Sequence, residues 1–240
     1  MDLKEIAGIS AVLDVDGSLS FPDIPDGVKA SERLFSAAKD YYYDETHNNN
    51  KILYRVYRDV CLPEHKELIS SNNLRYDMVS ISPGKIGREF IKTIGHYHPK
   101  ADGNEAYPEI YEVLHGSAIL LLQDENIADA IEVYAEVGAK VLIPPGYGHI
   151  TINPGNEYLV FSNIISNTFT SVYGLMEKNH GGVYYYIEEN GIRKWMKNPF
   201  YNKHPELKTL ETGQMPMIAG LIGPLLSESN RRSFQICVYE

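Results

Sequence analysis

The sequence predicts an all-β fold, either a sandwich or a barrel. From residue 51 onward, short runs rich in Val, Ile and Tyr are separated by Gly, Pro and Asn at intervals of roughly 8–12 residues, which is typical of such folds. Asn190-Gly191 lies between two of these runs, and Asn-Gly is the strongest short hairpin signal. We therefore expect strands to account for the middle of the chain.

The predicted strands share an apolar pattern and end at turn residues. In chain order they are residues 52–58, 75–81, 88–94, 109–114, 118–123, 130–136, 140–144, 149–153, 157–165, 183–189 and 192–197. One helix is predicted before them. Ser31 can cap it, and Leu34, Ala37 and Ala38 recur at helical spacing up to about Tyr43.

The chain is expected to form one domain with three parts. They are an N-terminal arm and helix over residues 1–50, a barrel over 51–198, and a C-terminal wrapping segment over 199–240. Two prolines and a glycine at 21–27 indicate an irregular arm, and prolines and charges follow residue 199. The 240 residues are within the range of one large all-β unit.

Charge and cysteine content exclude several classes of protein. The chain has 22 Lys plus Arg against 32 Asp plus Glu, a net charge of −10, which argues against nucleic acid and membrane surfaces as partners. Its two cysteines have no CxxC spacing, which favours a reduced compartment. Asp14 and Asp16 interrupt the first apolar run, so no signal peptide is expected, and we predict a cytoplasmic protein.

Three histidines form the candidate chemical site. His96 and His98 follow the run at 88–94, and residues two apart in a strand lie on the same face. Alone, this pair is compatible with two surface histidines. His149 opens a strand after a Pro/Gly turn in the segment GAKVLIPPGYGHITIN. This segment resembles the second cupin motif, G-x5-P-x-G-x2-H-x3-N, at every specified position.

A glutamate completes the resemblance to the two cupin motifs. Glu109 lies seven residues before Gly116, as the first motif requires, but ten residues separate it from His98, more than is usual. Glu105 is nearer to the histidines but lies in a polar loop, so Glu109, which begins an apolar strand, is preferred. Three imidazoles and one carboxylate suit zinc, iron, nickel, manganese or cobalt. The non-functional alternative is that His149 is a core histidine whose hydrogen bonds are satisfied and that binds no metal.

Within the cupins, the segments EFIKTIGHYHP, PEIYEVLHGSAILLLQ and IPPGYGHITINPGNEYLVFSN resemble the cupin-type glucose-6-phosphate isomerases. The resemblance implies a jelly-roll barrel, a homodimer, a phosphosugar substrate and one divalent transition metal per subunit, with iron in the first place. It implies that the metal ligands are His96, His98, Glu109 and His149, and that the substrate-binding residues are Thr93, Gly95, Tyr111 and Tyr173. The resemblance also implies a histidine two residues before Tyr173 and a tyrosine eight residues before it, but this chain has Ser171 and Ile165 at these positions.

The resemblance implies an aldose–ketose isomerisation between glucose 6-phosphate and fructose 6-phosphate, a step of glycolysis and gluconeogenesis. Glu109 is the candidate base for a proton shuttle between C1 and C2, and a hydride shift is the alternative. The cations that could bind the phosphate group are Lys85, Arg88 and Lys92, and the sequence does not favour one of them. The rival functions are another metal-dependent cupin enzyme, such as an oxygenase, and a non-catalytic cupin that binds a metal or a sugar.

Overall fold

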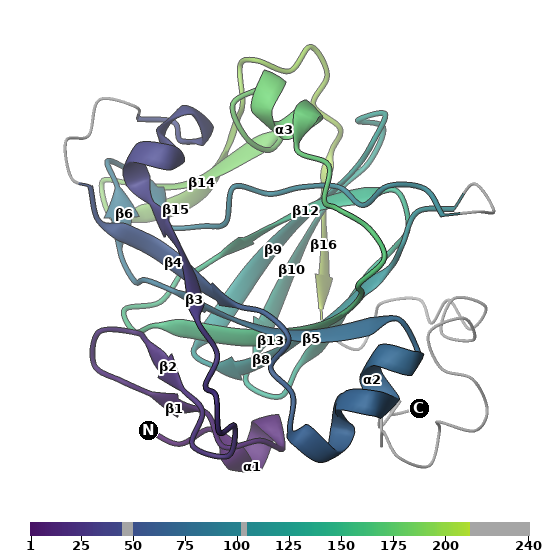
Figure 1. Cartoon of the computed structure of the whole chain (residues 1–240). Helices are drawn as coiled ribbons and strands as arrows, with labels where there is room; N and C mark the ends of the chain where they lie inside the picture. Colours follow the sequence, from purple (N-terminus) through teal and green to yellow (C-terminus); the bar gives the residue numbers. More distant parts are fainter. Residues whose placement is uncertain (45–49, 102–104, 212–240) are drawn as a thin grey trace.

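Two facing sheets build the molecule in a computed structural model that describes residues 1–44, 50–101 and 105–211 (Figure 1). The larger sheet has six strands in the order β11-β8-β13-β5-β4-β3, and all its pairs are antiparallel. In chain order these strands are β3 Ala30–Leu34, β4 Ile52–Tyr57, β5 Leu74–Ile81, β8 Glu109–His115, β11 Lys140–Ile143 and β13 Leu159–Ser166.

The smaller facing sheet has four strands in the order β12-β9-β10-β16. They are β9 Ser117–Asp124, β10 Ala130–Glu136, β12 Tyr147–Ile152 and β16 Leu207–Glu211. One core cluster contains residues of both sheets, among them Tyr111 and Leu120. The prediction of an all-β cupin jelly roll is confirmed, although the two sheets do not close into one continuous barrel.

A third sheet, in the order β15-β14-β7-β6, extends this core. Its strands are β6 Lys85–Ile86, β7 Glu89–Phe90, β14 Tyr184–Glu189 and β15 Ile192–Lys197. β14 and β15 form the predicted hairpin, and both turn residues have positive φ, 54° at Asn190 and 77° at Gly191. This backbone conformation is the one that a two-residue Asn-Gly turn requires.

The predicted helix at residues 31–43 is wrong. Its first part is strand β3, which pairs with β4, and its second part consists of the 3-10 turns η1 Phe35–Ala37 and η2 Lys39–Tyr41. Phe35, Ala38 and Tyr42 are buried in the main core, so two tight turns satisfy the apolar spacing that suggested a helix. Tertiary packing has overridden local propensity here.

Helices are few and short among the described residues. They are α1 Lys4–Ala7, α2 Lys66–Ser71, α3 Gly174–Lys178 and the 3-10 turn η3 Pro63–His65. No helix in this part of the chain has the length and apolar character needed to cross a membrane. α1 and the hairpin β1 Val12–Leu13 with β2 Leu19–Ser20 belong to a separate core cluster with Met78, Leu114 and Val160. The N-terminal arm therefore covers the outer face of the six-stranded sheet.

Two segments differ from the predicted strand pattern. The predicted strand at 88–94 is regular only at β7. Beyond β7 the chain runs alongside β12, to which isolated bridges at Lys92 and His96 connect it. Gly95 has a φ of 76°, which interrupts a regular strand. Within the segment expected to be irregular after residue 199, β16 pairs in parallel with β10, while residues 212–240 lie outside the described part.

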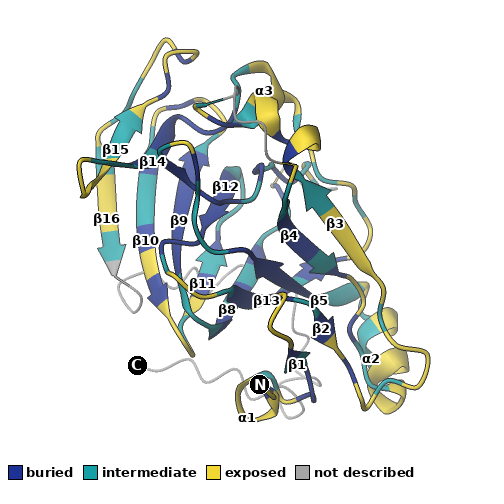
Figure 2. Cartoon of the chain, turned by 90° about the vertical axis from the view of Figure 1, so that its left-hand side faces the viewer, coloured by how far each residue is buried: buried dark blue, intermediate teal, exposed yellow. Residues whose placement is uncertain are grey.

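Burial follows this architecture (Figure 2). β9, β12 and β13 are almost entirely buried, whereas the edge strand β3 carries three exposed residues and β15 carries four. The space between the two large sheets is therefore the sheltered part of the molecule, and the candidate site lies there.

Candidate metal centre

Elements from both large sheets bring the four predicted ligands together. Glu109 begins β8 of the six-stranded sheet, and His149 lies on β12 of the four-stranded sheet. His96 and His98 lie on the segment after β7, which runs alongside β12. One ligand atom from each of the four residues lies within 4.8 Å of the others. We call this group the histidine–glutamate cluster. Glu105, the alternative carboxylate, is exposed.

A close backbone approach holds His96 beside His149. The His149 amide donates to the His96 carbonyl oxygen at 3.1 Å, and the His96 amide donates back at 3.4 Å. Gly95 permits this approach, because a Cβ there would lie 2.4 Å from Cγ1 of Ile150. The positive φ and the lack of space both favour glycine at this position.

Side-chain alternation then sends Tyr97 away from the two histidines on either side of it. Its ring lies in a second core cluster, and its hydroxyl accepts a hydrogen bond of 2.7 Å from Gln123. A Cβ on Gly148 would lie 2.5 Å from the Tyr97 ring. The glycine before His149 therefore makes room for the tyrosine between His96 and His98, so the two motifs fit each other in space.

The geometry of the cluster is compact and asymmetric. The ring centroid of His96 lies 5.2 Å from that of His98 and 4.4 Å from that of His149. Oε2 of Glu109 lies 3.3 Å from Nε2 of His98 and 3.2 Å from Nε2 of His149. The other carboxylate oxygen accepts a hydrogen bond from the Asn163 side chain on β13. Asn163 therefore orients Glu109 so that Oε2 faces the imidazoles.

His98 is held in one tautomer. Its Nδ1 lies 2.8 Å from the carbonyl oxygen of Tyr107, and a carbonyl oxygen can only accept. Nδ1 therefore carries the proton, and the lone pair of Nε2 is directed at the centre of the cluster. Such a partner on the far ring nitrogen is usual for histidines that bind metal.

The electrostatics of the cluster fit a divalent transition metal. Burial lowers the pKa of His149 and, together with the neighbouring His149, that of His96, which favours the neutral imidazole that binds metal. Burial would raise the pKa of Glu109, but contacts with His149 and His98 outweigh it and hold that pKa below its usual value.

Unsatisfied polar atoms support the same conclusion. Nε2 of His98, Nε2 of His149 and Oε2 of Glu109 are buried, and none has a hydrogen-bond partner among the described residues. Buried polar atoms are rarely left in this state. A bound cation would satisfy all three atoms at once, so the residues present fit a metal with three nitrogen ligands and one oxygen ligand.

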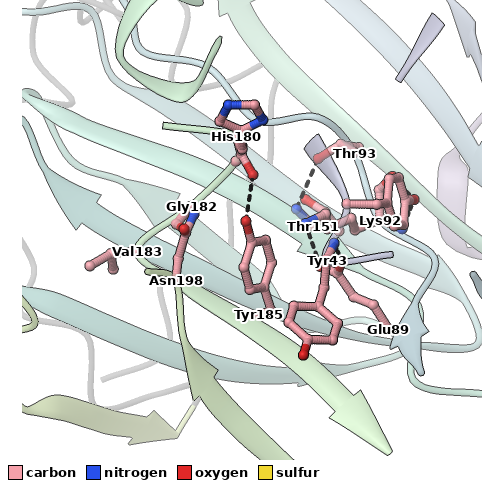
Figure 3. Close-up of polar contacts among 12 residues, drawn as sticks. Tyr43, Glu89, Lys92, Thr93, Thr151, His180, Gly182, Val183, Tyr185 and Asn198 are labelled. Atoms are coloured by element: carbon pink, nitrogen blue, oxygen red, sulfur yellow. Dashed lines mark hydrogen bonds and ion pairs between the residues drawn. The ribbon is translucent and has the colours of Figure 1, made fainter. Parts of the chain in front are cut away.

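The four predicted substrate residues lie around this cluster. The Tyr111 ring contacts the His149 ring edge-on at 5.5 Å between centroids, and the Tyr173 ring lies 5.7 Å from that of His96. The Thr93 hydroxyl accepts a hydrogen bond of 3.0 Å from the Thr151 amide (Figure 3). Gly95 precedes His96 directly. Whether these residues contact a substrate remains a prediction.

The three candidate phosphate donors already have carboxylate partners. Lys85 pairs with Glu188, Arg88 pairs with Glu189, and Lys92 pairs with Glu89. Lys92 is also buried, with 2% of its side chain exposed. An anionic substrate would have to compete with these carboxylates, so none of the three is a free cation for a phosphate group.

Sequence reasoning did not identify several residues at the site. Asn163 is a polar residue at an inward-facing position of a predicted strand, and this pattern could have suggested a role at the site. Tyr107 and Phe169 come from two loops, and their rings stack on each other at 4.6 Å beside His98. No spacing in the sequence links those loops.

Sequence comparisons with known proteins give consistent matches. Residues 28–205 match the model of the family described as glucose-6-phosphate isomerase (GPI). The glucose-6-phosphate isomerase of Pyrococcus furiosus is 33% identical over 187 residues, which cover 75% of this chain and 92% of that protein. That of Thermococcus kodakarensis is 34% identical over 192 residues, with 78% and 94% covered.

A solved structure of Bacillus subtilis oxalate decarboxylase shows a weaker likeness. It aligns with 50% of this chain and 27% of its own, with a TM-score of 0.38 and 21% sequence identity. The sequence relatives, and not this structure, identify the family.

Proposed function

Because the chain belongs to the glucose-6-phosphate isomerase family, we propose that it interconverts glucose 6-phosphate and fructose 6-phosphate at the histidine–glutamate cluster. The observation that carries the proposal is the convergence of three buried, unpartnered ligand atoms at one point between the sheets. His96, His98, Glu109 and His149 would hold a divalent transition metal, with iron as our first candidate. When bound, such an ion supplies a Lewis acid that polarises the sugar's carbonyl group.

The protein's own residues would position the sugar and move its protons. Tyr111 and Tyr173 flank the cluster, and we propose that they line the sugar site. Glu109 is the one carboxylate of the cluster, so we propose that its Oε2 takes the proton from one carbon and returns it to the next. Because Oε2 is also the proposed metal ligand, Glu109 would have to turn from the imidazoles toward the sugar to act as the base, while Asn163 occupies its other oxygen.

A hydride shift between the carbons is the alternative route, and it needs no base. The two routes are separated by running the reaction in deuterated water. Deuterium in the product at C1 or C2 would support transfer through Glu109. Product free of solvent deuterium would favour the hydride shift.

Phosphate recognition needs a cation, and we propose Arg33. Arg33 is opposite Tyr54 in the β3–β4 register, so both side chains lie on the core face of the sheet. Burial raises the pKa of Tyr54 and, together with Glu177, that of Tyr41, while the Arg33 guanidinium opposes both shifts, so it lies near these two hydroxyls. No carboxylate in the described ranges forms an ion pair with Arg33. Thr93 and the Gly95 amide would complete the phosphate contacts.

The remaining expectations are also proposals. Strand β3 forms an open edge of the six-stranded sheet, and unpaired edges favour pairing with a second copy. We propose a cytoplasmic homodimer that serves glycolysis or gluconeogenesis. Sedimentation analysis of the purified protein would test the dimer.

An isomerase assay with metal analysis tests the proposed function. Protein purified without metal and then loaded with iron, nickel, manganese, zinc or cobalt is expected to produce glucose 6-phosphate from fructose 6-phosphate. Chelation is expected to abolish turnover, and reloading to restore it. His149→Ala should bind no metal and show no activity. Absence of turnover with all five metals would refute the proposal.

A further inference from the structure

The Phe169 ring lies between a proposed metal ligand and the loop residue that orients it. Its centroid is 4.9 Å from that of His98 and 4.6 Å from that of Tyr107, with planes 50° and 22° apart. Tyr107 also provides the carbonyl oxygen that accepts from Nδ1 of His98. One aromatic ring therefore contacts both partners of the hydrogen bond that fixes the imidazole.

Further hydrogen bonds hold Tyr107 in this place. Its hydroxyl accepts a bond of 3.2 Å from Thr168, whose own hydroxyl lies 2.9 Å from that of Ser166 at the end of β13. The Tyr107 amide donates to the Pro99 carbonyl oxygen at 3.3 Å. The loop is thus fastened at its side chain and at its backbone.

Core packing does not account for Phe169. Its side chain is only partly buried, and it belongs to none of the three core clusters formed by the described residues. The ring contacts that the structure shows for it are those with His98 and Tyr107. Removing the ring should therefore affect these two residues first.

We propose that Phe169 is a positioning residue for His98. Its ring keeps the imidazole against the Tyr107 carbonyl, so that Nδ1 remains protonated and Nε2 is presented to the metal. The inference rests on the proposed metal site, but the tautomer of His98 can be measured without any metal. Without the ring, the imidazole can rotate away from the carbonyl, and the proton of Nδ1 loses its fixed acceptor.

The test compares Phe169 with a matched phenylalanine remote from the cluster. Phe200 stacks on His180 at 4.1 Å and 25°, and it is 51% exposed. Phe169→Ala is expected to weaken binding of Zn²⁺ or Co²⁺ by about 10–100-fold in calorimetric titrations. Phe200→Ala should leave the affinity within about twofold. Phe169→Tyr, which keeps the ring, should stay near the wild-type value.

Nitrogen NMR of histidine-labelled, metal-free protein gives the second measurement. In the wild type, His98 should show a protonated Nδ1 whose proton is hydrogen-bonded to the Tyr107 carbonyl oxygen, and in Phe169→Ala the proton should no longer be fixed at this position. Phe169→Leu keeps most of the bulk and serves if the alanine variant does not fold. Unchanged metal affinity together with an unchanged tautomer would overturn the proposal. A wild type that binds no metal would refute the proposed function, and the tautomer would still decide the role of Phe169.

Discussion

Among the residues that the structure describes, two glutamates are almost completely buried, and their surroundings differ in an informative way. Glu89 and Glu109 have 1% and 0% of their surfaces exposed. Both oxygens of Glu89 are satisfied, one by the Lys92 ammonium and one by the Tyr43 amide at 2.8 Å (Figure 3). Glu109 has one oxygen bound by Asn163 and one with no hydrogen-bond partner.

The negative charge of Glu89 is also balanced by Lys92, which two aromatic rings surround. The Lys92 ammonium lies 4.9 Å from the ring centroids of Tyr42 and of Tyr185, whose hydroxyl donates to the His180 carbonyl oxygen (Figure 3). Burial raises the pKa of Glu89 although Lys92 opposes this, while the histidines lower that of Glu109. The satisfied acceptors of Glu89 fit a structural role, whereas the free oxygen of Glu109 beside unpartnered imidazoles supports the metal site that we propose.

The sharpest test of this comparison removes each carboxylate charge in turn. Glu109→Gln keeps the shape of the side chain but loses the charged ligand and the proposed base. We expect kcat/KM to fall by about 10⁴-fold, roughly 5 kcal/mol, with loss of metal in elemental analysis. Glu89→Gln should retain the metal in whatever fraction remains folded. Equal metal loss in both variants would contradict the distinction.

The ion pair of Glu89 should matter for stability instead. Lys92→Met leaves Glu89 buried without its partner, which typically costs about 3–5 kcal/mol of unfolding free energy. The double variant Glu89→Gln/Lys92→Met should recover most of this loss, because no unpaired charge remains. Urea denaturation of the three proteins measures the effect. A double variant as unstable as Lys92→Met would show that packing, and not charge, dominates.

A smaller effect is expected from the residue that orients Glu109. Asn163→Ala removes the donor to the second carboxylate oxygen, and we expect metal affinity to fall by about tenfold, the lower end for such partners. Asn198→Ala is the control, since that buried amide donates to the Asn179 and Gly182 carbonyl oxygens. It should lower stability while metal affinity stays the same. Titration calorimetry of folded protein separates the two outcomes.

The smallest effect is the pH dependence of stability that comes from Glu89. Because its pKa is raised from 4.5 in the folded state, the folded protein binds this proton more tightly than the unfolded chain. Its contribution is therefore fully present below pH 4.5 and is lost as pH rises through the folded pKa, by at most about 1.4 kcal/mol per pH unit. Denaturation of the wild type and of Glu89→Gln/Lys92→Met across this range should show the difference, and parallel curves would contradict it.

Local rules account for what the sequence predicted well. Period-two alternation and Gly/Pro turns located most strands, and Asn190-Gly191 located its hairpin, because both depend on neighbours in the chain. The choice of Glu109 over the nearer Glu105 agrees with the structure, since an apolar strand leads to the interior and a polar loop does not. Strand alternation suggested that His96 and His98 act as a pair, the resemblance to the second cupin motif pointed to His149, and the structure brings all three together.

The sequence did not reveal features that arise from contacts between distant segments. Residues 31–43 carry helical spacing, but their apolar side chains reach the core through a strand and two 3-10 turns. The sequence offers Lys92 as a candidate phosphate donor, but the fold places Glu89, Tyr42 and Tyr185 around it. The stack of His98, Phe169 and Tyr107 exists only because two loops meet, and single-chain patterns do not encode such a meeting.

The cluster takes its side chains from both halves of the sandwich, with Glu109 on one layer and His149 on the other. A cation bound by both residues would link the two sheets directly. By mass action it would add about 2.7 kcal/mol to the folded state when its free concentration is a hundred times its dissociation constant. Heat tolerance would then depend on metal supply, and starvation for the ion would deplete the protein itself as well as its turnover.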